Sequence, residues 1–170
     1  MISPDDQQPQ ISIAPILVIG IGNEYRGDDG LGLIVARRLR ERHLPKVTIM
    51  EIGGDLTVLG ETWQGAETVI LVDAVASGRE PGTIYRFEAH REPLPQKLFA
   101  PSSTHALGLA EAMELARALK LLPANLIVYG LEGKYFAAGA GLSPEVQQAL
   151  PRLVEQIRED LDRLEKMGKL

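Results

Sequence analysis

Acidic side chains and one histidine follow several hydrophobic stretches of this chain, at positions from which they could hold a metal ion. The stretch GIGNEYRGDDGLG at residues 20–32 carries Asp28 and Asp29. Asp73 closes a third aliphatic run, and His105 follows the serine-rich segment PSST. Two carboxylates and one imidazole from three separate segments can bind zinc, nickel or manganese and leave coordination positions open. An open position is what metal-assisted hydrolysis or a metal-sensing step requires.

The glycines of residues 20–32 first suggest a phosphate-binding loop, but the spacing excludes one. A Rossmann fingerprint needs G-x-G-x-x-G, whereas here Gly20 and Gly22 are followed by no glycine until Gly27. A P-loop needs a lysine followed by serine or threonine, and this stretch has none. Carboxylates at a helix N-terminus would also repel a phosphate. The metal hypothesis therefore remains.

Each candidate also has a purely structural explanation. Asp28 and Asp29 could cap the helix that follows them. Asp73 could be a turn residue, and His105 could be a histidine satisfied in the core or on the surface. The acidic run at residues 159–165 is expected to be a solvated helix face. What favours a site is the shared location of many acids after predicted strands, which also include Glu24, Glu51, Asp55 and Glu132.

Hydrophobic periodicity predicts the elements that must position these side chains. Strands are expected at residues 16–19, 46–52, 68–75, 82–89 and 125–133. Helices are expected at residues 31–42, 55–64, 104–120 and from 143 onward. Ser143 should cap the last helix with Pro144 at its first position, and Pro151 should kink or interrupt it. The alternation predicts an α/β fold whose sites lie beyond the carboxyl ends of a mainly parallel sheet.

Composition limits the class of protein. A chain of 170 residues favours one domain, and we expect a loose tail at residues 1–13 and a single α/β domain at residues 14–170. Because the net charge is −5, no global basic field is available to hold nucleic acid. The absence of cysteine excludes disulfides, thiolate ligands and a cysteine nucleophile, and is compatible with the cytoplasm. No apolar run approaches the length needed for membrane insertion.

Four stretches, in this order and spacing, give the chain a specific resemblance: GIGNEYRGDDGLG (20–32), LVDAV (71–75), STHALGL (103–109) and GLSPEV (141–146). Over about residues 16–160 they resemble the maturation endopeptidases of nickel–iron hydrogenases. The element G-N-x-x-x-x-D-D/E-x-x-G is fairly specific, and the later aspartate and histidine strengthen the match. One departure is EIGGD at residues 51–55, where the glycine pair is kept but the flanking acids differ, and this loop is expected to affect which hydrogenase is recognised.

The resemblance implies a fold, an activity and a ligand set. The fold would be a phosphorylase/hydrolase-like α/β/α sandwich of three layers with a mostly parallel central sheet. The activity would be removal of the C-terminal extension of a hydrogenase large-subunit precursor after nickel insertion, by an enzyme historically grouped with aspartic-type endopeptidases. The family's metal-contacting positions fall on Asp29, Asp73 and His105. These residues would meet nickel supplied by the precursor, and cadmium or zinc would substitute for it in vitro.

More than one chemistry is compatible with these residues. Asp29 and Asp73 could share a proton, as in two-aspartate proteases. The resemblance favours instead that ligation of nickel positions the scissile peptide, so that a metal-polarised carbonyl or metal-bound water reacts. No serine nucleophile is indicated, since Ser102 and Ser103 lack a G-x-S-x-G elbow. The alternatives from other classes are a metal-dependent hydrolase of a small substrate and a non-catalytic flavodoxin-like binding module.

Overall fold

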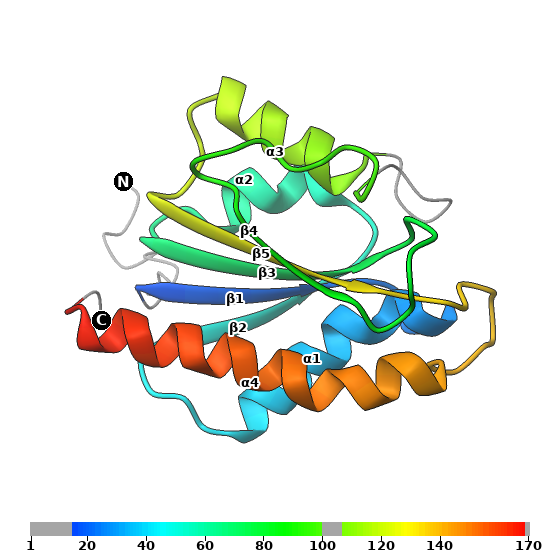
Figure 1. Ribbon diagram of the computed structural model, residues 1–170. Coiled ribbons are helices and arrows are strands. Elements are labelled where there is room, and N and C mark those ends of the chain that lie inside the picture. Colours follow the sequence, from blue (N-terminus) through cyan, green and yellow to red (C-terminus); the bar gives the residue numbers. More distant parts are fainter. Residues whose placement is uncertain (1–14, 100–106, 169–170) are drawn as a thin grey trace, which may run out of the picture.

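The computed structural model of the chain describes residues 15–99 and 107–168, and its centre is a sheet of five strands (Figure 1). The strand order is β2-β1-β3-β5-β4, and β4 is antiparallel to β5 while the other neighbours are parallel. The expected tail at residues 1–13 lies outside the described residues. The strands are β1 (Ile16–Ile21), β2 (Val47–Ile52), β3 (Thr68–Val75), β4 (Ile84–Glu88) and β5 (Asn125–Glu132).

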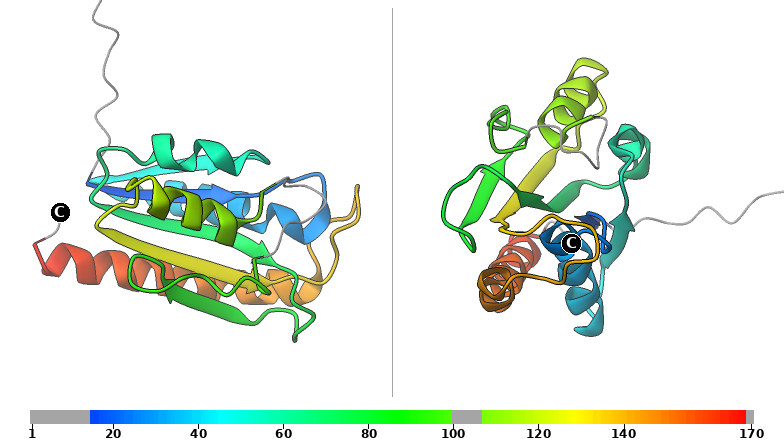
Figure 2. Two further views of the ribbon diagram at one scale, coloured as in Figure 1. Left: turned by 90° about the horizontal axis from the view of Figure 1, so that it is seen from above. Right: turned by 90° about the vertical axis from the view of Figure 1, so that its right-hand side faces the viewer.

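Helices cover both faces of this sheet, which confirms the expected three-layer α/β/α fold (Figure 2). One face packs against α1 (Leu31–Glu41) and α4 (Pro144–Lys166). The other packs against α2 (Leu59–Thr62), which a 3₁₀ turn η2 (Leu56–Val58) precedes, and against α3 (Leu109–Ala118).

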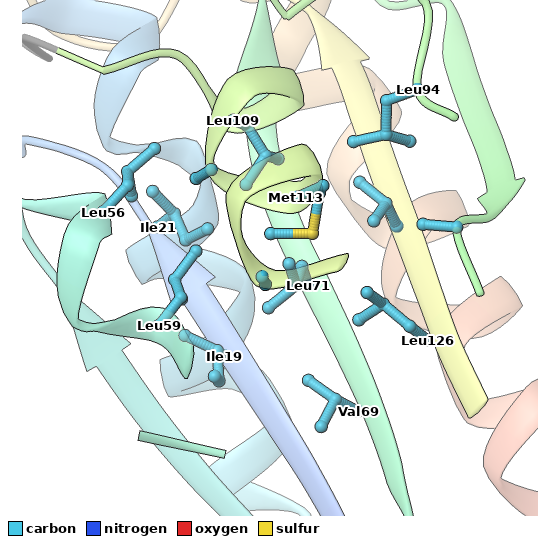
Figure 3. Packing of buried hydrophobic residues seen from close by; sticks show 14 of the residues in the cluster. Ile19, Ile21, Leu56, Leu59, Val69, Leu71, Leu94, Leu109, Met113 and Leu126 are labelled. Atoms are coloured by element: carbon cyan, nitrogen blue, oxygen red, sulfur yellow. The ribbon is translucent and has the colours of Figure 1, made fainter. Parts of the chain in front are cut away.

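Strand β1, which lies between β2 and β3, is buried on both faces, as its continuous aliphatic run predicts. Ile19 and Ile21 belong to the cluster under α2 and α3, which Figure 3 shows at close range. Ile16 and Val18 alternate with them and belong to the cluster under α1 and α4. Burial of each such side chain contributes about 1.5–3 kcal/mol, so this strand anchors both layers of helices.

The last helix continues through its proline. Ser143 caps it by accepting a hydrogen bond from the backbone N–H of Val146 (3.4 Å), and Pro144 occupies the first turn, as expected. The expectation that Pro151 would interrupt the helix is wrong, because α4 runs through it for 23 residues. Its apolar face packs on the sheet, and this burial offsets the hydrogen bond that proline removes. Among the described residues, no helix is long and apolar enough to cross a membrane.

One residue of the acidic run at 159–165 is buried, contrary to the expectation of a solvated face. Asp160 is 3 % exposed and accepts hydrogen bonds from the Tyr129 hydroxyl (2.6 Å) and from Nε of Arg86 (2.8 Å). The three residues lie on α4, β5 and β4, and they tie the edge of the sheet to the helix. Burial and the Asp160 carboxylate both raise the pKa of Tyr129, which keeps its hydroxyl protonated as the donor.

The strand order places a topological switch point at the carboxyl ends of β1 and β3. The chain leaves β1 for β2 on one side and returns to β3 on the other, which is the switch point where α/β sheets bind ligands. The strand expected at residues 68–75 is confirmed as β3, and Asp73 lies two residues before its end, paired with Gly130 of β5. The helix expected at 104–120 begins only at Leu109 in the described part, and residues 104–106 lie outside it.

Candidate functional site

The turn between β1 and α1 places two adjacent carboxylates at the carboxyl end of β1. A single 3₁₀ turn, η1 (Gly27–Gly30), carries Asp28 and Asp29 and runs directly into α1. Asp28 is fully buried and Asp29 is 5 % exposed. Both carboxylates are therefore buried by the fold, although residues at this position before a helix often act as helix caps. Neither side chain caps η1 or α1.

Asp28 instead holds the segment that follows β5. Its Oδ2 accepts hydrogen bonds from the backbone N–H groups of Lys134 (2.7 Å) and Tyr135 (2.9 Å). Its Oδ1 accepts a third from the N–H of Ser143 (2.7 Å). A buried carboxylate with three backbone donors is well satisfied. Asp28 is therefore a structural residue that joins the β1–α1 turn to residues 133–143.

Glycines allow this close fit between turn and segment. Gly27 has a positive φ of 59°, and a Cβ there would lie 2.3 Å from the carbonyl oxygen of Tyr135. Gly133 faces Asp28 from the other side, and a Cβ on it would lie 2.9 Å from the Asp28 Cβ. The backbone N–H of Gly27 also donates to the carbonyl of Ala140 (3.1 Å). No larger residue fits at Gly27 without moving the segment.

Asp29 and Asp73 lie near each other at the carboxyl ends of β1 and β3. Each is 5 % exposed, and they are close enough for the charge on Asp29 to affect the ionisation of Asp73. Burial raises the pKa of Asp73 well above its ordinary range, and the negative charge of Asp29 raises it further. A hydrogen bond from the backbone N–H of Ala74 (2.8 Å) acts in the opposite direction. Two of the three predicted ligands are thus neighbours.

The third predicted ligand, His105, lies outside the described residues. Within residues 15–99 and 107–168, no three histidine, aspartate or glutamate side chains gather in a way that could hold a metal ion.

Two other acids at this edge pair with arginines of α1. Glu51, at the end of β2, accepts hydrogen bonds from Arg37 (3.0 Å) and Arg40 (2.9 Å). Glu24 accepts from Arg37 as well (2.9 Å). Burial opposes the ionisation of Glu51, but the hydrogen bonds from Arg37 and Arg40 outweigh it and lower the pKa of Glu51. The arginines therefore neutralise Glu24 and Glu51, two of the acids that follow the predicted strands.

Two more acids bind backbone and hydroxyl groups. Asp55 caps η2 by accepting a hydrogen bond from the backbone N–H of Thr57 (3.0 Å). Glu132 is 1 % exposed and accepts from the N–H groups of Ser77 (2.8 Å) and Gly78 (3.0 Å). Most acids near the strand ends therefore bind arginines, hydroxyls or backbone N–H groups and have structural roles. The pair Asp29 and Asp73 remains as the candidate site.

A family model described as hydrogenase maturation protease matches residues 33–160, which is most of the chain. The chain belongs to the hydrogenase maturation protease family. It is similar to a putative hydrogenase maturation protease of Methanocaldococcus jannaschii, with 30 % identity over 161 residues, 84 % of this chain and 93 % of that protein. Hydrogenase 2 maturation protease of Escherichia coli is 28 % identical over 146 residues, covering 84 % of this chain and 87 % of that one.

Solved structures of the hydrogenase maturation protease family share the fold. The hydrogenase maturating endopeptidase HybD from E. coli has a TM-score of 0.72 at 28 % identity, covering 90 % of this chain and 93 % of its own. The maturation protease HycI from Thermococcus kodakarensis has a TM-score of 0.68 at 27 % identity, covering 88 % and 93 %. These likenesses confirm the family and the fold that the resemblance implied, and they confirm that the chain is a protease of hydrogenase maturation.

Sequence reasoning missed the segment at residues 133–143 as part of the site. The sequence singles out Glu132 only as an acid after a predicted strand and Ser143 only as a helix cap. The structure shows that the segment contributes backbone donors to Asp28 instead. Its glycines and the buried Ser143 were the available signal, since glycine clusters after a strand indicate close backbone approach.

Proposed function

We propose that Asp29 and Asp73, with His105, bind the nickel of a hydrogenase large-subunit precursor while the enzyme removes the C-terminal extension of that precursor. The observation that carries this proposal is the pair of carboxylates buried together at the carboxyl ends of β1 and β3. Two like charges held close at low exposure are unfavourable unless a proton or a cation lies between them. Nickel in the substrate supplies such a cation.

The chemistry of the donor set fits nickel. Carboxylate oxygens and an imidazole nitrogen are ligands that nickel and zinc both accept. Cadmium and zinc are expected to replace nickel in vitro for the same reason. Because the two carboxylates are held by β3 and by the rigid turn before α1, they meet the metal without reorganising.

Ligation of the metal would place the scissile peptide for cleavage. Holding the reacting groups in one geometry can contribute about 7–11 kcal/mol toward lowering the barrier. The nickel of the substrate then polarises the scissile carbonyl or a bound water. The enzyme would hold an incomplete ligand shell until the precursor arrives, which explains selectivity for nickel-loaded substrate. A location in the cytoplasm stays a prediction.

The test compares nickel-loaded with nickel-free precursor. The purified protein is mixed with each form, and the intact mass of the large subunit is followed over time. Loss of the C-terminal peptide is expected only from the loaded form. Loss from both forms at equal rate would falsify the recognition of nickel.

Site variants test the residues. Asp29→Asn, Asp73→Asn and His105→Ala are expected to lower kcat/KM at least about 100-fold, as removal of a preorganised charged group does. The matched control is Glu24→Gln, on the same turn but 43 % exposed and paired with Arg37; it is expected to cleave like the wild type. Cadmium binding by isothermal calorimetry gives a readout separate from activity. Full activity in all three site variants would disprove the assignment.

A further inference from the structure

Two tyrosine rings are exposed beside the turn that carries Asp29. Tyr25 is 74 % exposed and Tyr135 is 47 % exposed. Tyr25 lies just before η1, and Tyr135 lies in the segment after β5. Figure 1 shows the turn after β1 and the segment after β5 at the same end of the sheet, and Figure 2 shows the same. We call Tyr25 and Tyr135 the tyrosine rim.

The backbone of both rim residues is fixed although the rings face solvent. The carbonyl of Tyr25 accepts a hydrogen bond from the N–H of Gly139 (2.8 Å), and its own N–H donates to Oδ1 of Asn23 (3.0 Å). Tyr135 is bound to Asp28 through its N–H and its carbonyl. An aromatic ring on a fixed backbone buries a large area on binding at a small entropic cost.

One face of the Tyr135 ring is already covered by a cation. The ammonium of Lys134 lies 5.2 Å from the ring centroid, and it also pairs with Glu145 (2.7 Å). These contacts steady the ring and leave about half of the residue exposed. The structure itself does not use the remaining surface.

Exposed apolar residues at the other end of the sheet make a useful contrast. Leu119 is 59 % exposed and Met167 is 67 % exposed. They are the C-terminal caps of α3 and α4, and Figure 1 shows both helix ends at the end of the sheet opposite the segment after β5. They match the rim in exposure and are remote from Asp29.

We propose that the tyrosine rim is a docking surface for the folded body of the hydrogenase large-subunit precursor, through apolar groups on that body. This inference rests on the proposed function. Asp29 and Asp73 are each 5 % exposed, so a peptide chain that reaches them brings the body of the precursor close to this edge. The rim is continuous with the site, because Asp28 binds the backbone of Tyr135 and is adjacent to Asp29.

The test measures binding and cleavage separately. Nickel-loaded precursor is titrated against the wild type, Tyr25→Ala, Tyr135→Ala and the double variant, and kcat and KM are measured from the intact mass. Truncation of an aromatic hot spot is expected to raise Kd and KM about tenfold for each ring. The value of kcat is expected to stay within about twofold, because neither ring touches the reacting groups.

Leu119→Ala and Met167→Ala are the controls and are expected to bind like the wild type. Thermal melts show whether each variant is folded. If Tyr135→Ala does not fold, Tyr25→Ala alone still tests the proposal, because a ring this exposed contributes little to stability. Unchanged Kd and KM in the rim variants, with cleavage by the wild type, overturn the rim and leave the proposed function intact. A fall in kcat at constant KM also overturns it. A wild type that neither binds nor cleaves the precursor overturns both.

Discussion

Asp28 and Tyr135 exchange hydrogen bonds in both directions. The backbone N–H of Asp28 donates to the carbonyl of Tyr135 (2.7 Å), and the Asp28 carboxylate accepts from the N–H of Tyr135 (2.9 Å). This reciprocal pair fixes the turn before α1 against the segment after β5. The position of Asp29, one residue later in the same turn, depends on it.

Asp28→Ala is expected to destabilise the protein by about 2–4 kcal/mol, because three buried backbone N–H groups lose their acceptor. Chemical denaturation measures the change in the free energy of unfolding. Glu24→Ala on the same turn is the control, since an exposed ion pair contributes about 1 kcal/mol or less. Equal denaturation midpoints for the two variants would contradict the structural role of Asp28.

Gly27→Ala tests the close fit of the turn against the segment. Gly27 and Gly139 both have a positive φ, 59° and 78°. A Cβ on Gly139 meets nothing within 4 Å, whereas one on Gly27 meets the carbonyl of Tyr135 at 2.3 Å. Gly139→Ala is therefore expected to cost only the backbone strain of about 1–2 kcal/mol. Gly27→Ala should cost about 1–3 kcal/mol more, from overpacking, and should also lower cleavage activity.

Asp73→Asn is expected to raise thermal stability at pH 7 while it abolishes cleavage. Because the pKa of Asp73 is raised on folding, the folded state binds a proton more tightly than the unfolded state. The free energy of unfolding therefore falls as the pH rises from the ordinary carboxyl value of 3.8 through the raised value. Asparagine does not ionise, so the variant should melt higher at pH 7, by a few degrees (about 2–4 °C for each kcal/mol gained).

The difference between wild type and Asp73→Asn should vanish below about pH 4, where both forms are neutral. Asp55 supplies a control of opposite sign, since hydrogen bonds from Thr57 lower its pKa. Asp55→Asn is expected to gain no stability at pH 7. A lower melting temperature for Asp73→Asn at pH 7 would show that its charge is compensated in the folded protein.

Asp160→Ala tests a buried carboxylate away from the site. Its loss leaves Arg86 and the hydroxyl of Tyr129 without their shared acceptor, at an expected cost of about 3 kcal/mol. Tyr129→Phe should cost about 1 kcal/mol, since it removes one hydrogen bond. Both variants are expected to keep the wild-type kcat/KM. A loss of activity in the folded Tyr129→Phe variant would link this cluster to the reaction.

Strands and helices could be predicted because their signals are local. The aliphatic runs of β1, β3 and β5 indicate buried strands, and Ser143-Pro144 marks the start of α4 within two residues. The roles of the acids could not be predicted in the same way. The donors to Asp28 lie more than 100 residues away in the chain, so no pattern near Asp28 distinguishes it from a helix cap.

Tertiary packing also overrode two local rules. Asp160 belongs to a charged run, yet its position on α4 turns it toward the hydroxyl of Tyr129 on β5. Pro151 lacks the N–H that continues a helix, yet packing of α4 on the sheet keeps the helix continuous. The pair of Asp29 and Asp73 was anticipated because parallel strands end at one edge of a sheet, which topology dictates without knowledge of contacts.

The insertion of β5 between β3 and β4 sets the order in which the enzyme can mature during its own synthesis. A growing chain that has emerged only as far as β4 has no neighbour for that strand, because β5 is still to be translated. The acceptor oxygens of Asp28 likewise wait for residues 134–143. Residues 134–143 are translated after the turn that carries Asp28 and Asp29, so a growing chain lacks the donors that fix this turn until residue 143 has emerged. The edge that holds Asp29 and Asp73 is therefore completed only late in synthesis.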